Sequence, residues 1–258
     1  MNNVLGRFCW HDLITTDLDA ALPFYREVVG WTVEHWDGAG HPYPIWHTPS
    51  GRGVGGAGPL PDDARAMGAP PHWMAHIATP HLADTVGQAE RLGATVLVPP
   101  TPIPTVGAFA ILADPHGTTF AAFQAEGDVP GHDGAPEIGD FAWHELMAPD
   151  LDAAFDFYAA LFGWQRMGAM DMGPMGSYVL YGRGERMLGG MMRTPPEMPV
   201  AGAWLHYAHV ADVPAAVATA QRLGGTLLHG PQEVPGGDLI AHLLDPQGGM
   251  FALHGSKP

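Results

Sequence analysis

The side chains of this chain that could do chemistry are histidines and carboxylates, and they are widely spaced. None of the 15 histidines forms an HxH or HExxH pair, and no Ser-His-Asp set with a nucleophile elbow is found. Glu145 and His206 are the candidate catalytic residues, because a carboxylate and a histidine can bind a ligand by hydrogen bonds or act in general acid–base catalysis. If His254 joined them, the three would form a two-histidine, one-carboxylate set that suits Fe(II) or Zn.

A tandem duplication must position these residues. The segment from Phe8 to Trp31 and the segment from Phe141 to Trp164 are identical at 13 of 24 positions, at a constant offset of 133 residues. Such a match predicts two copies of one unit. We expect domain 1 over residues 1–125, a Gly- and Pro-rich linker over 126–139, and domain 2 over 140–258.

Each copy is expected to be β-α-β-β-β written twice. Residues 8–13 alternate in polarity, which is typical of a strand, and residues 18–29 have helical spacing. Thr16 or Asp17 is the expected N-cap, and Gly30 is the expected end of the helix. The same pattern starts again near residue 72. We therefore predict an α+β fold of four such motifs that form two open, cup-shaped antiparallel sheets with the helices outside.

The charge and the cysteine content exclude several classes of partner. A formal charge of −16 argues against nucleic acid and against an anionic membrane surface. No apolar run approaches the ~18 residues of a membrane span, and we see no signal peptide. Cys9 is the one cysteine, so no internal disulfide can form. These features favour a cytoplasmic protein with a small-molecule partner, and Cys9 itself is expected to be buried and inert.

The ordered motifs resemble the vicinal oxygen chelate superfamily, which contains glyoxalases, bleomycin resistance proteins and extradiol dioxygenases. The resemblance rests on the opening WH(D/E)L…FY…GW, on A-x-R-L-G and on D-P-x-G, and it covers nearly the whole chain in both copies. Within the superfamily, the chain is similar to a tandem-domain, glyoxalase-like subgroup that includes a culture-filtrate antigen and anthracycline-pathway accessory proteins. Two domains in one chain can pair internally, which favours a monomer.

The resemblance implies a divalent metal held by one residue on each of the first, fifth and eighth strands of a cup. Those positions fall on Trp10, Trp73 and Ala121 in copy one, and on Trp143, His206 and Ala252 in copy two. Copy one therefore keeps no ligand and copy two keeps one, whereas a divalent site needs about three. We expect no metal cofactor. The alternative is Fe, Zn, Mn or Ni in cup two, held by Glu145, His206 and His254.

Indoles replace the expected ligands. Trp10, Trp73 and Trp143 would point into the cups, and Asp12 and Glu145 would share the inward face because strand side chains alternate. Such a cup suits a flat, mostly apolar ligand with a polar group. The alternative is that the tryptophans only fill the core.

The predicted ligand-binding set is one of inward-facing residues, namely Trp10, Asp12, Trp73, Trp143, Glu145, His206 and His254. We expect a protein that binds an aromatic, polyketide- or quinone-like metabolite, for sequestration or for a tailoring step. Whether it is an enzyme stays open at this point. The alternatives are a metal-dependent lyase or oxygenase of glyoxalase or dioxygenase type with its site in the C-terminal cup, and a structural protein without a ligand.

Overall fold

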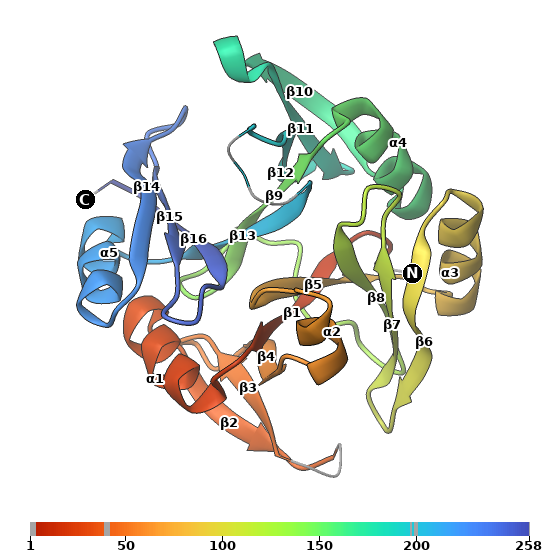
Figure 1. The fold of residues 1–258 in the computed structure, drawn as a ribbon, viewed down its shortest axis with the longest axis horizontal. Coiled ribbons are helices and arrows are strands. Elements are labelled where there is room, and N and C mark those ends of the chain that lie inside the picture. The colour runs from red at the N-terminus through yellow and green to blue at the C-terminus, as the bar shows by residue number, and fades with distance from the viewer. Residues whose placement is uncertain (1–3, 39–41, 197, 199–200, 258) are drawn as a thin grey trace. The chain divides into compact units, whose positions relative to one another are not determined.

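The computed structural model describes residues 4–38, 42–196, 198 and 201–257. Four βαβββ motifs follow one another, as expected, with a short helix α2 and a 3-10 helix η1 added in connections (Figure 1). The first repeat contains β1 (Phe8–Thr15), α1 (Leu18–Val29), β2 (Thr32–Trp36), β3 (Tyr43–His47), β4 (Gly53–Pro59), α2 (Asp62–Ala66), β5 (His72–Ala78), α3 (Leu82–Arg91), β6 (Thr95–Ile103), β7 (Gly107–Ala113) and β8 (Thr119–Ala125). The second contains β9 (Phe141–Ala148), α4 (Leu151–Phe162), β10 (Gln165–Asp171), η1 (Gly173–Met175), β11 (Ser177–Arg183), β12 (Arg186–Arg193), β13 (Ala203–His209), α5 (Val213–Arg222), β14 (Thr226–Glu233), β15 (Leu239–Leu244) and β16 (Met250–Gly255).

The strands form two open sheets of eight, in the orders β2-β3-β4-β1-β5-β8-β7-β6 and β10-β11-β12-β9-β13-β16-β15-β14. The predicted α+β class with two open sheets is confirmed. The sheets are mixed rather than antiparallel, because β1 pairs with β4 and β5 pairs with β8 in parallel. Parallel pairing follows from the crossover that each motif makes between its first and last strands. None of the helices formed by the described residues is long and apolar enough to cross a membrane.

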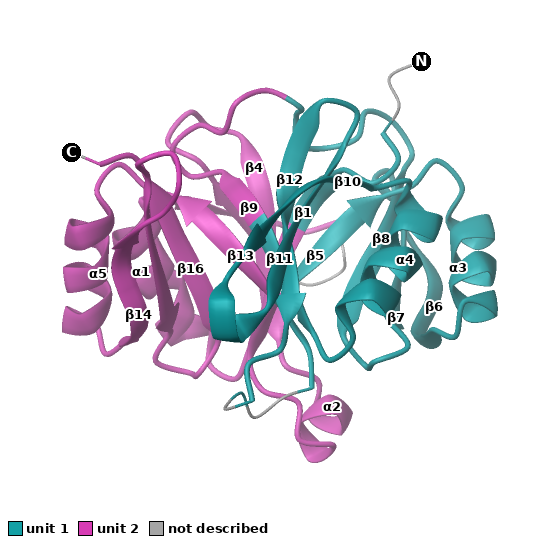
Figure 2. Cartoon of the chain, turned by 90° about the horizontal axis from the view of Figure 1, so that it is seen from above, with its two compact units in different colours: residues 1–10, 74–133, 144–204 teal, residues 11–73, 134–143, 205–258 magenta. Residues whose placement is uncertain are grey.

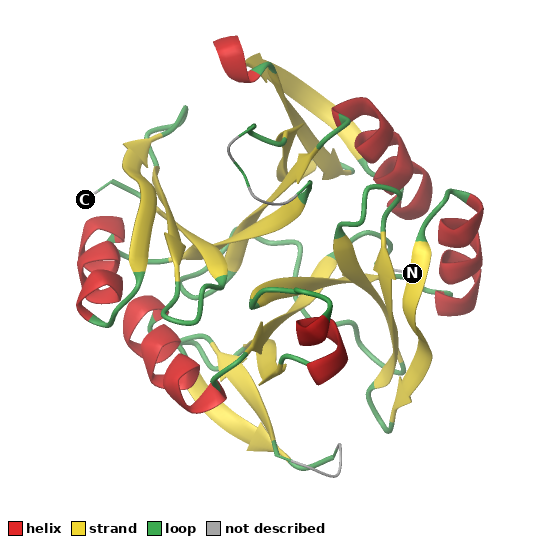
Figure 3. Cartoon of the chain, in the orientation of Figure 1, coloured by secondary structure: helices red, strands yellow, loops and turns green. Residues whose placement is uncertain are grey.

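Local signals place the helices as the sequence predicted. Asp17 caps α1 by accepting a hydrogen bond from the backbone N–H of Ala20 at 3.0 Å, and Asp150 caps α4 in the same way. Gly30 ends α1 in the left-handed conformation, with φ of 87°, which a side chain would disfavour. Helices α1, α3, α4 and α5 cover one side of their strands, as Figure 3 shows in red and yellow. We call the opposite side of the strands the inner face.

The compact units and the sequence repeats divide the chain differently (Figure 2). Unit 1 contains Met1–Trp10, Met74–Asp133 and His144–Trp204, and unit 2 contains His11–Trp73, Gly134–Trp143 and Leu205–Pro258. Unit 2 therefore combines the first and fourth motifs, with α1 packed against α5, and unit 1 combines the second and third, with α3 packed against α4 (Figure 1). Each unit draws its core from both repeats.

A buried Tyr–Asp–Trp cluster lies at the centre of unit 2. Tyr25 of α1 donates a hydrogen bond to the Asp245 carboxylate at 2.9 Å and accepts one from the Trp73 indole at 3.0 Å. The second oxygen of Asp245 accepts the backbone N–H groups of Gln247 and Gly249 in the turn before β16. Burial and the neighbouring carboxylate raise the pKa of the Tyr25 phenol well above its usual value, so the phenol keeps the proton it donates.

The same cluster recurs in unit 1. Tyr158 of α4 donates to the Asp114 carboxylate at 3.2 Å and accepts from the Trp204 indole at 3.2 Å. In both units the tyrosine and the aspartate come from different repeats. The buried carboxylate costs little only while its hydrogen bonds are made, so the cluster ties the two repeats together within each unit.

Replacing Tyr25 with phenylalanine should therefore destabilise the fold by about 2–3 kcal/mol, because it leaves a buried carboxylate oxygen and the Trp73 N–H without their partner. Urea-induced unfolding monitored by circular dichroism measures this change. Tyr158→Phe should cause a loss of similar size by removing the same bonds in unit 1. Wild-type midpoints for both variants would contradict the role given to the cluster.

Candidate functional site

Strand register shows how the two repeats correspond at β5 and β13. The parallel pair β5–β8 sets His76 beside Ala121, and the parallel pair β13–β16 sets Tyr207 beside Ala252. The offset at both positions is therefore 131 residues, not the 133 used to match Trp73 with His206. The length difference falls before β5 and β13 rather than after them. Trp204 is the true counterpart of Trp73, which explains why both indoles bind the equivalent tyrosine.

Trp73 and His206 lie on the helix-facing side of their strands, so the prediction that both point inward is wrong. Trp73 is 4% exposed and belongs to the same apolar cluster as Tyr25 and Trp31. His206 is 1% exposed and shares its strand face with Ala208, another member of that cluster. The error in the offset between the repeats is two residues, and side chains two residues apart on a strand share one face. Trp73 and His206 therefore lie on the same kind of face, and the inward prediction is wrong for both. The core alternative fits Trp73.

His206 is also poorly placed for acid–base work. Burial lowers the pKa of its imidazole from 6.5 to about 3, so it stays neutral and accepts protons weakly near neutral pH. In unit 2 its ring lies edge to face against His11, with ring centroids 5.1 Å apart. His11 in turn stacks on Phe141, with ring centroids 3.9 Å apart. In unit 1 His144 stacks in the same way on Phe8, at 3.7 Å.

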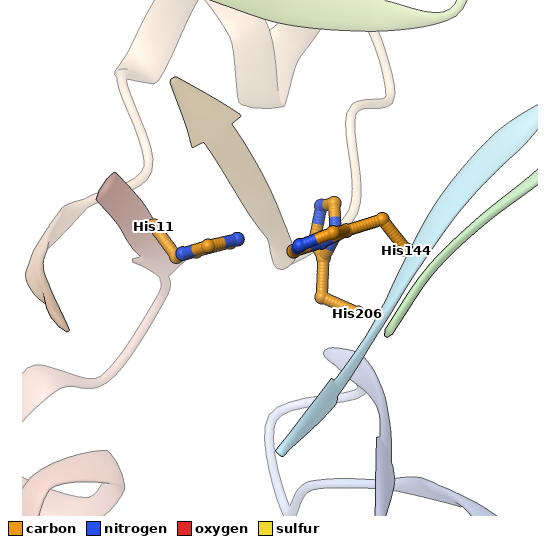
Figure 4. Close-up of side chains that lie close together, drawn as sticks. All are labelled: His11, His144 and His206. Carbon is orange, nitrogen blue, oxygen red and sulfur yellow. The ribbon is translucent and has the colours of Figure 1, made fainter. Parts of the chain in front are cut away.

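One three-histidine group has metal-compatible spacing among residues 4–38, 42–196, 198 and 201–257. It consists of His11, His144 and His206, all buried, and one ring nitrogen of each lies within 4.8 Å of the other two (Figure 4). Three nitrogen donors are enough to hold a divalent ion. The predicted alternative set of Glu145, His206 and His254 is not brought together in this way, because His206 and His254 lie on opposite faces of their strands.

The inner face of unit 2 carries hydrogen-bonded tyrosine and histidine side chains that sequence reasoning had passed over. Tyr207 of β13 bonds to His242 of β15 at 2.8 Å between Oη and Nε2. His229 of β14 lies beside His242, with ring centroids 5.4 Å apart. Ala252 lies between Tyr207 and His242 in strand order and is fully buried. A small residue at that position lets the two longer side chains meet across β16.

A second hydrogen-bonded group follows along the same inner face. His209 and His254 are register partners on β13 and β16, and their Nδ1 atoms are 3.0 Å apart. The other ring nitrogen of His254 lies 3.1 Å from the carboxylate of Asp238. His254 was predicted to lie on this face, and the structure places it there.

The first repeat has no comparable polar set on the matching strands of unit 1. Strand pairing makes Val98, Ile111 and Ala121 the counterparts of His229, His242 and Ala252. By the same register, the remaining pairs are Ala78 for His209, Phe123 for His254 and His76 for Tyr207. Four apolar residues of the first repeat are thus histidines in the second. A sequence comparison at an offset of 131 would have shown this contrast.

Burial favours the neutral form of two imidazoles on this inner face, those of His242 and His209. Burial is the main cause that lowers the pKa of His242 from 6.5 to about 4, and the neighbouring His229 adds to it. Burial and the adjacent His254 also lower the pKa of His209. At neutral pH these rings can therefore each donate one hydrogen bond and accept another, without carrying charge.

The carboxylates Asp12 and Glu145 lie on the inner faces of β1 and β9 and are each held by a tyrosine. In unit 2 the Tyr43 hydroxyl donates to Asp12, and in unit 1 the Tyr178 hydroxyl donates to Glu145 at 2.8 Å. A Cβ at Gly56 or Gly190 would overlap these two tyrosine rings, so the glycines of both repeats are needed to seat them. The Gly-Gly pair that recurs at residues 55–56 and 189–190 is the sequence signal for this arrangement.

The tryptophans of β1 and β9 are half-buried. Trp10 packs against a small apolar cluster of Cys9, Ala78 and Phe123 on the inner face of the first repeat within unit 1. Trp143 precedes Glu145 by two residues on β9 and so shares its inner face. Burial raises the pKa of the Cys9 thiol to about 12, which makes it unreactive as a nucleophile.

Comparison with known proteins agrees with this architecture. The family model of the glyoxalase/bleomycin resistance protein/dioxygenase superfamily matches residues 140–253, and that of a glyoxalase-like domain matches residues 9–123. The chain is 31% identical over 246 residues to the glyoxylase-like protein CFP32 of Mycobacterium tuberculosis, covering 95% of this chain and 92% of CFP32. The chain belongs to the glyoxalase/bleomycin resistance protein/dioxygenase superfamily.

A second relative and two solved structures also match nearly the whole chain. The chain is 29% identical to the anthracycline biosynthesis protein DnrV of Streptomyces peucetius, over 96% of this chain and 92% of DnrV. The fold matches that of the 2,3-dioxygenase LapB from Pseudomonas sp. KL28, with a TM-score of 0.68, 12% identity and coverage of 99% and 94%. It also matches a Mn(II)-bound glyoxalase from Novosphingobium aromaticivorans, with a TM-score of 0.63, 15% identity and coverage of 98% and 82%.

The residues at the superfamily's expected metal positions do not fit a divalent ion. After the register correction, the first, fifth and eighth strands offer Trp10, His76 and Ala121 on the inner face of the first repeat. In the second repeat they offer Trp143, Tyr207 and Ala252. One imidazole in the first set, and a tyrosine already bonded to His242 in the second, fall short of three donors. The buried three-histidine group lies outside these positions.

The low pKa of His242 has a measurable consequence. Because this pKa is lower in the folded protein than the 6.5 of a free imidazole, His242 should stay neutral down to about pH 4, and its contribution to stability should fall as the pH drops from about 6.5 to about 4. Titration followed by histidine NMR signals tests this. His229→Val should raise the pKa of His242 by removing the second cause. A His242 that titrates near 6.5 in the folded protein would contradict the assignment.

Proposed function

We propose that this protein binds an oxygenated aromatic metabolite, of polyketide or quinone type, on the inner face of its C-terminal repeat. It would sequester the metabolite or assist a tailoring step. The observation that carries the proposal is the replacement of Val98, Ile111, Ala78 and Phe123 of the first repeat by four histidines in the second. Strand pairing is the same at these positions in both repeats, so the pairing itself does not require these changes.

Neutral imidazoles suit the oxygens of such a ligand. A phenol donates one hydrogen bond and a quinone carbonyl accepts them, and a neutral histidine can meet either need. Tyr207 adds a hydroxyl group to the same face, and Trp143 offers an indole surface on β9. The net charge of −16 disfavours a strongly anionic ligand. Flat, uncharged and oxygen-bearing molecules are the class that these side chains match.

The relationship to DnrV supports the same ligand class, since that relative is named for anthracycline biosynthesis and matches nearly the whole chain. We place ligand binding in the second repeat because Ala78 and Phe123, the counterparts of His209 and His254, belong to an apolar cluster in the first. We keep Glu145, held by Tyr178, and Asp12, held by Tyr43, as candidate polar contacts. We further propose that the protein acts as a monomer in the cytoplasm, where the lone Cys9 would stay reduced.

Binding can be tested with 1,8-dihydroxyanthraquinone as the probe. The double variant His229→Val with His242→Ile installs the residues of the first repeat at the same register, so the backbone should tolerate it. We expect saturable quenching of tryptophan fluorescence in the wild type and binding at least ~10-fold weaker in the variant, because two hydrogen-bonding groups are lost. His76→Tyr, which installs the Tyr207 counterpart in the first repeat, should leave affinity unchanged. Absence of saturable quenching in the wild type would refute the proposal.

A second candidate function is a metal-dependent lyase or oxygenase, and the three-histidine group of His11, His144 and His206 is the observation that favours it. Protein purified without chelators should contain far less than about one equivalent of Fe, Zn, Mn or Ni if the binding proposal holds. About one equivalent, lost on His206→Ala, would favour the metal-dependent function instead. Alanine stands at the equivalent position of the first repeat, Ala75, so this variant should fold.

A further inference from the structure

Three groups on the inner face of unit 2 form a line of hydrogen bonds that binding alone does not require. The Asp238 carboxylate lies 3.1 Å from Nε2 of His254, and Nδ1 of His254 lies 3.0 Å from Nδ1 of His209. All three belong to one compact unit, so one set of strands fixes their geometry. Asp238 stands directly before β15, and the two histidines are register partners on β13 and β16.

The order of these bonds determines which nitrogens carry protons. An ionised carboxylate can only accept, so His254 must donate through its Nε2–H. In a neutral ring the Nδ1 of His254 then holds a lone pair and accepts the Nδ1–H of His209. The remaining nitrogen of His209, Nε2, is left with a lone pair. His209 is therefore held in the tautomer that presents Nε2 as a base, by bonds that run back to Asp238.

The position of His209 is fixed by its backbone as well. Its N–H donates to the carbonyl of Asp140 at 2.7 Å, and its carbonyl accepts the N–H of Gly139 at 2.8 Å. Burial is the main cause that lowers the pKa of His209, and the neighbouring His254 adds to it, while Asp238 and Asp140 act in the opposite direction. His209 is thus a neutral, oriented imidazole that remains half-buried rather than fully enclosed.

We propose that His209 is the general base of a proton-transfer reaction on the bound metabolite, with His254 and Asp238 as its positioning residues. The inference rests on the proposed function, because it needs a ligand on the same inner face. The substrate class is an aromatic ketone with an acidic C–H next to its carbonyl, and the reaction is enolisation leading to keto–enol isomerisation.

The reaction balances without a metal or an oxidant. Nε2 of His209 takes the proton, the C–H bond breaks, and its electron pair forms the carbon–carbon double bond of an enolate. The Nδ1 proton of His209 can move to Nδ1 of His254, which places the positive charge beside the Asp238 carboxylate. Return of a proton to the enolate oxygen gives the enol, and its return to carbon regenerates the ketone. No net proton or electron is gained or lost.

The first repeat supplies a matched comparison. Ala78 and Phe123 occupy the positions of His209 and His254, so no such line of bonds can form there. The variants His209→Ala and His254→Phe therefore install residues that the same strand pairing already accommodates. Both changes remove part of the relay and leave the Tyr207–His242 pair in place.

The tautomers can be read directly by nitrogen-15 NMR of the histidine rings in the intact protein. We expect His209 to carry its proton on Nδ1 and His254 on Nε2. His254→Phe should release His209 to the Nε2–H form that free neutral histidine prefers, which a purely structural role for His254 would not require. Finding His209 protonated on Nε2 in the wild type near neutral pH would overturn the relay.

Proton transfer is tested by deuterium exchange at the acidic carbon of 2-tetralone in heavy water. The wild type should accelerate exchange, and His209→Ala should reduce the acceleration by about 100-fold, the usual contribution of a general base. His254→Phe should reduce it less. Both variants also remove a candidate ligand contact, so exchange is compared at a 2-tetralone concentration that saturates each protein. Probe binding without accelerated exchange in the wild type would overturn the relay and leave the binding function standing, whereas loss of probe binding in the wild type would overturn the binding function itself.

Discussion

The structure depends on a buried tyrosine that must find its aspartate in the other repeat. Tyr25 binds Asp245 in unit 2, and Tyr158 binds Asp114 in unit 1, each with a tryptophan N–H on the phenol oxygen. An unpaired buried carboxylate would cost several kcal/mol, so these bonds constrain how the repeats combine. Each compact unit therefore contains motifs from both repeats, although each repeat pairs its own strands into a sheet. Each core is therefore completed only when both repeats are present.

Shared scaffolding makes the differences between the repeats informative. Capped helices, Gly-Gly pairs beneath tyrosines and the Tyr–Asp–Trp clusters occur in both. On the inner face, by contrast, the first repeat is apolar around Phe123, whereas the second carries Tyr207, His242, His209 and His254. The polar set of the second repeat is the observation on which the proposed ligand site rests. For each of these histidines, strand pairing also identifies the apolar residue at the equivalent position of the first repeat, which can serve as a control substitution.

The superfamily supplies the scaffold, and this chain has changed what the scaffold holds. The strands that carry metal ligands in the superfamily present indoles, alanines, one histidine (His76) and one tyrosine already engaged by His242. Among the polar groups on the inner face of the second repeat, His242 and His209 favour their neutral form because burial lowers their pKa values. Imidazoles of this kind can form hydrogen bonds to oxygen atoms and can transfer protons, and the proposed ligand class of carbonyl and phenol compounds follows from these properties.

The sequence by itself determined the duplication, the βαβββ order, the capped helices and the superfamily, because these depend on local periodicity and on spacing within one repeat. It also placed Asp12, Glu145 and His254 on inner strand faces. Only the tertiary structure decided the register of β5 and β13, and with it the faces of Trp73 and His206. A length difference in the preceding connection is invisible to periodicity, while strand pairing with β8 and β16 fixes it. The polar set of Tyr207, His209, His229 and His242 followed from that register, because residues on separate strands become neighbours only when the strands pair.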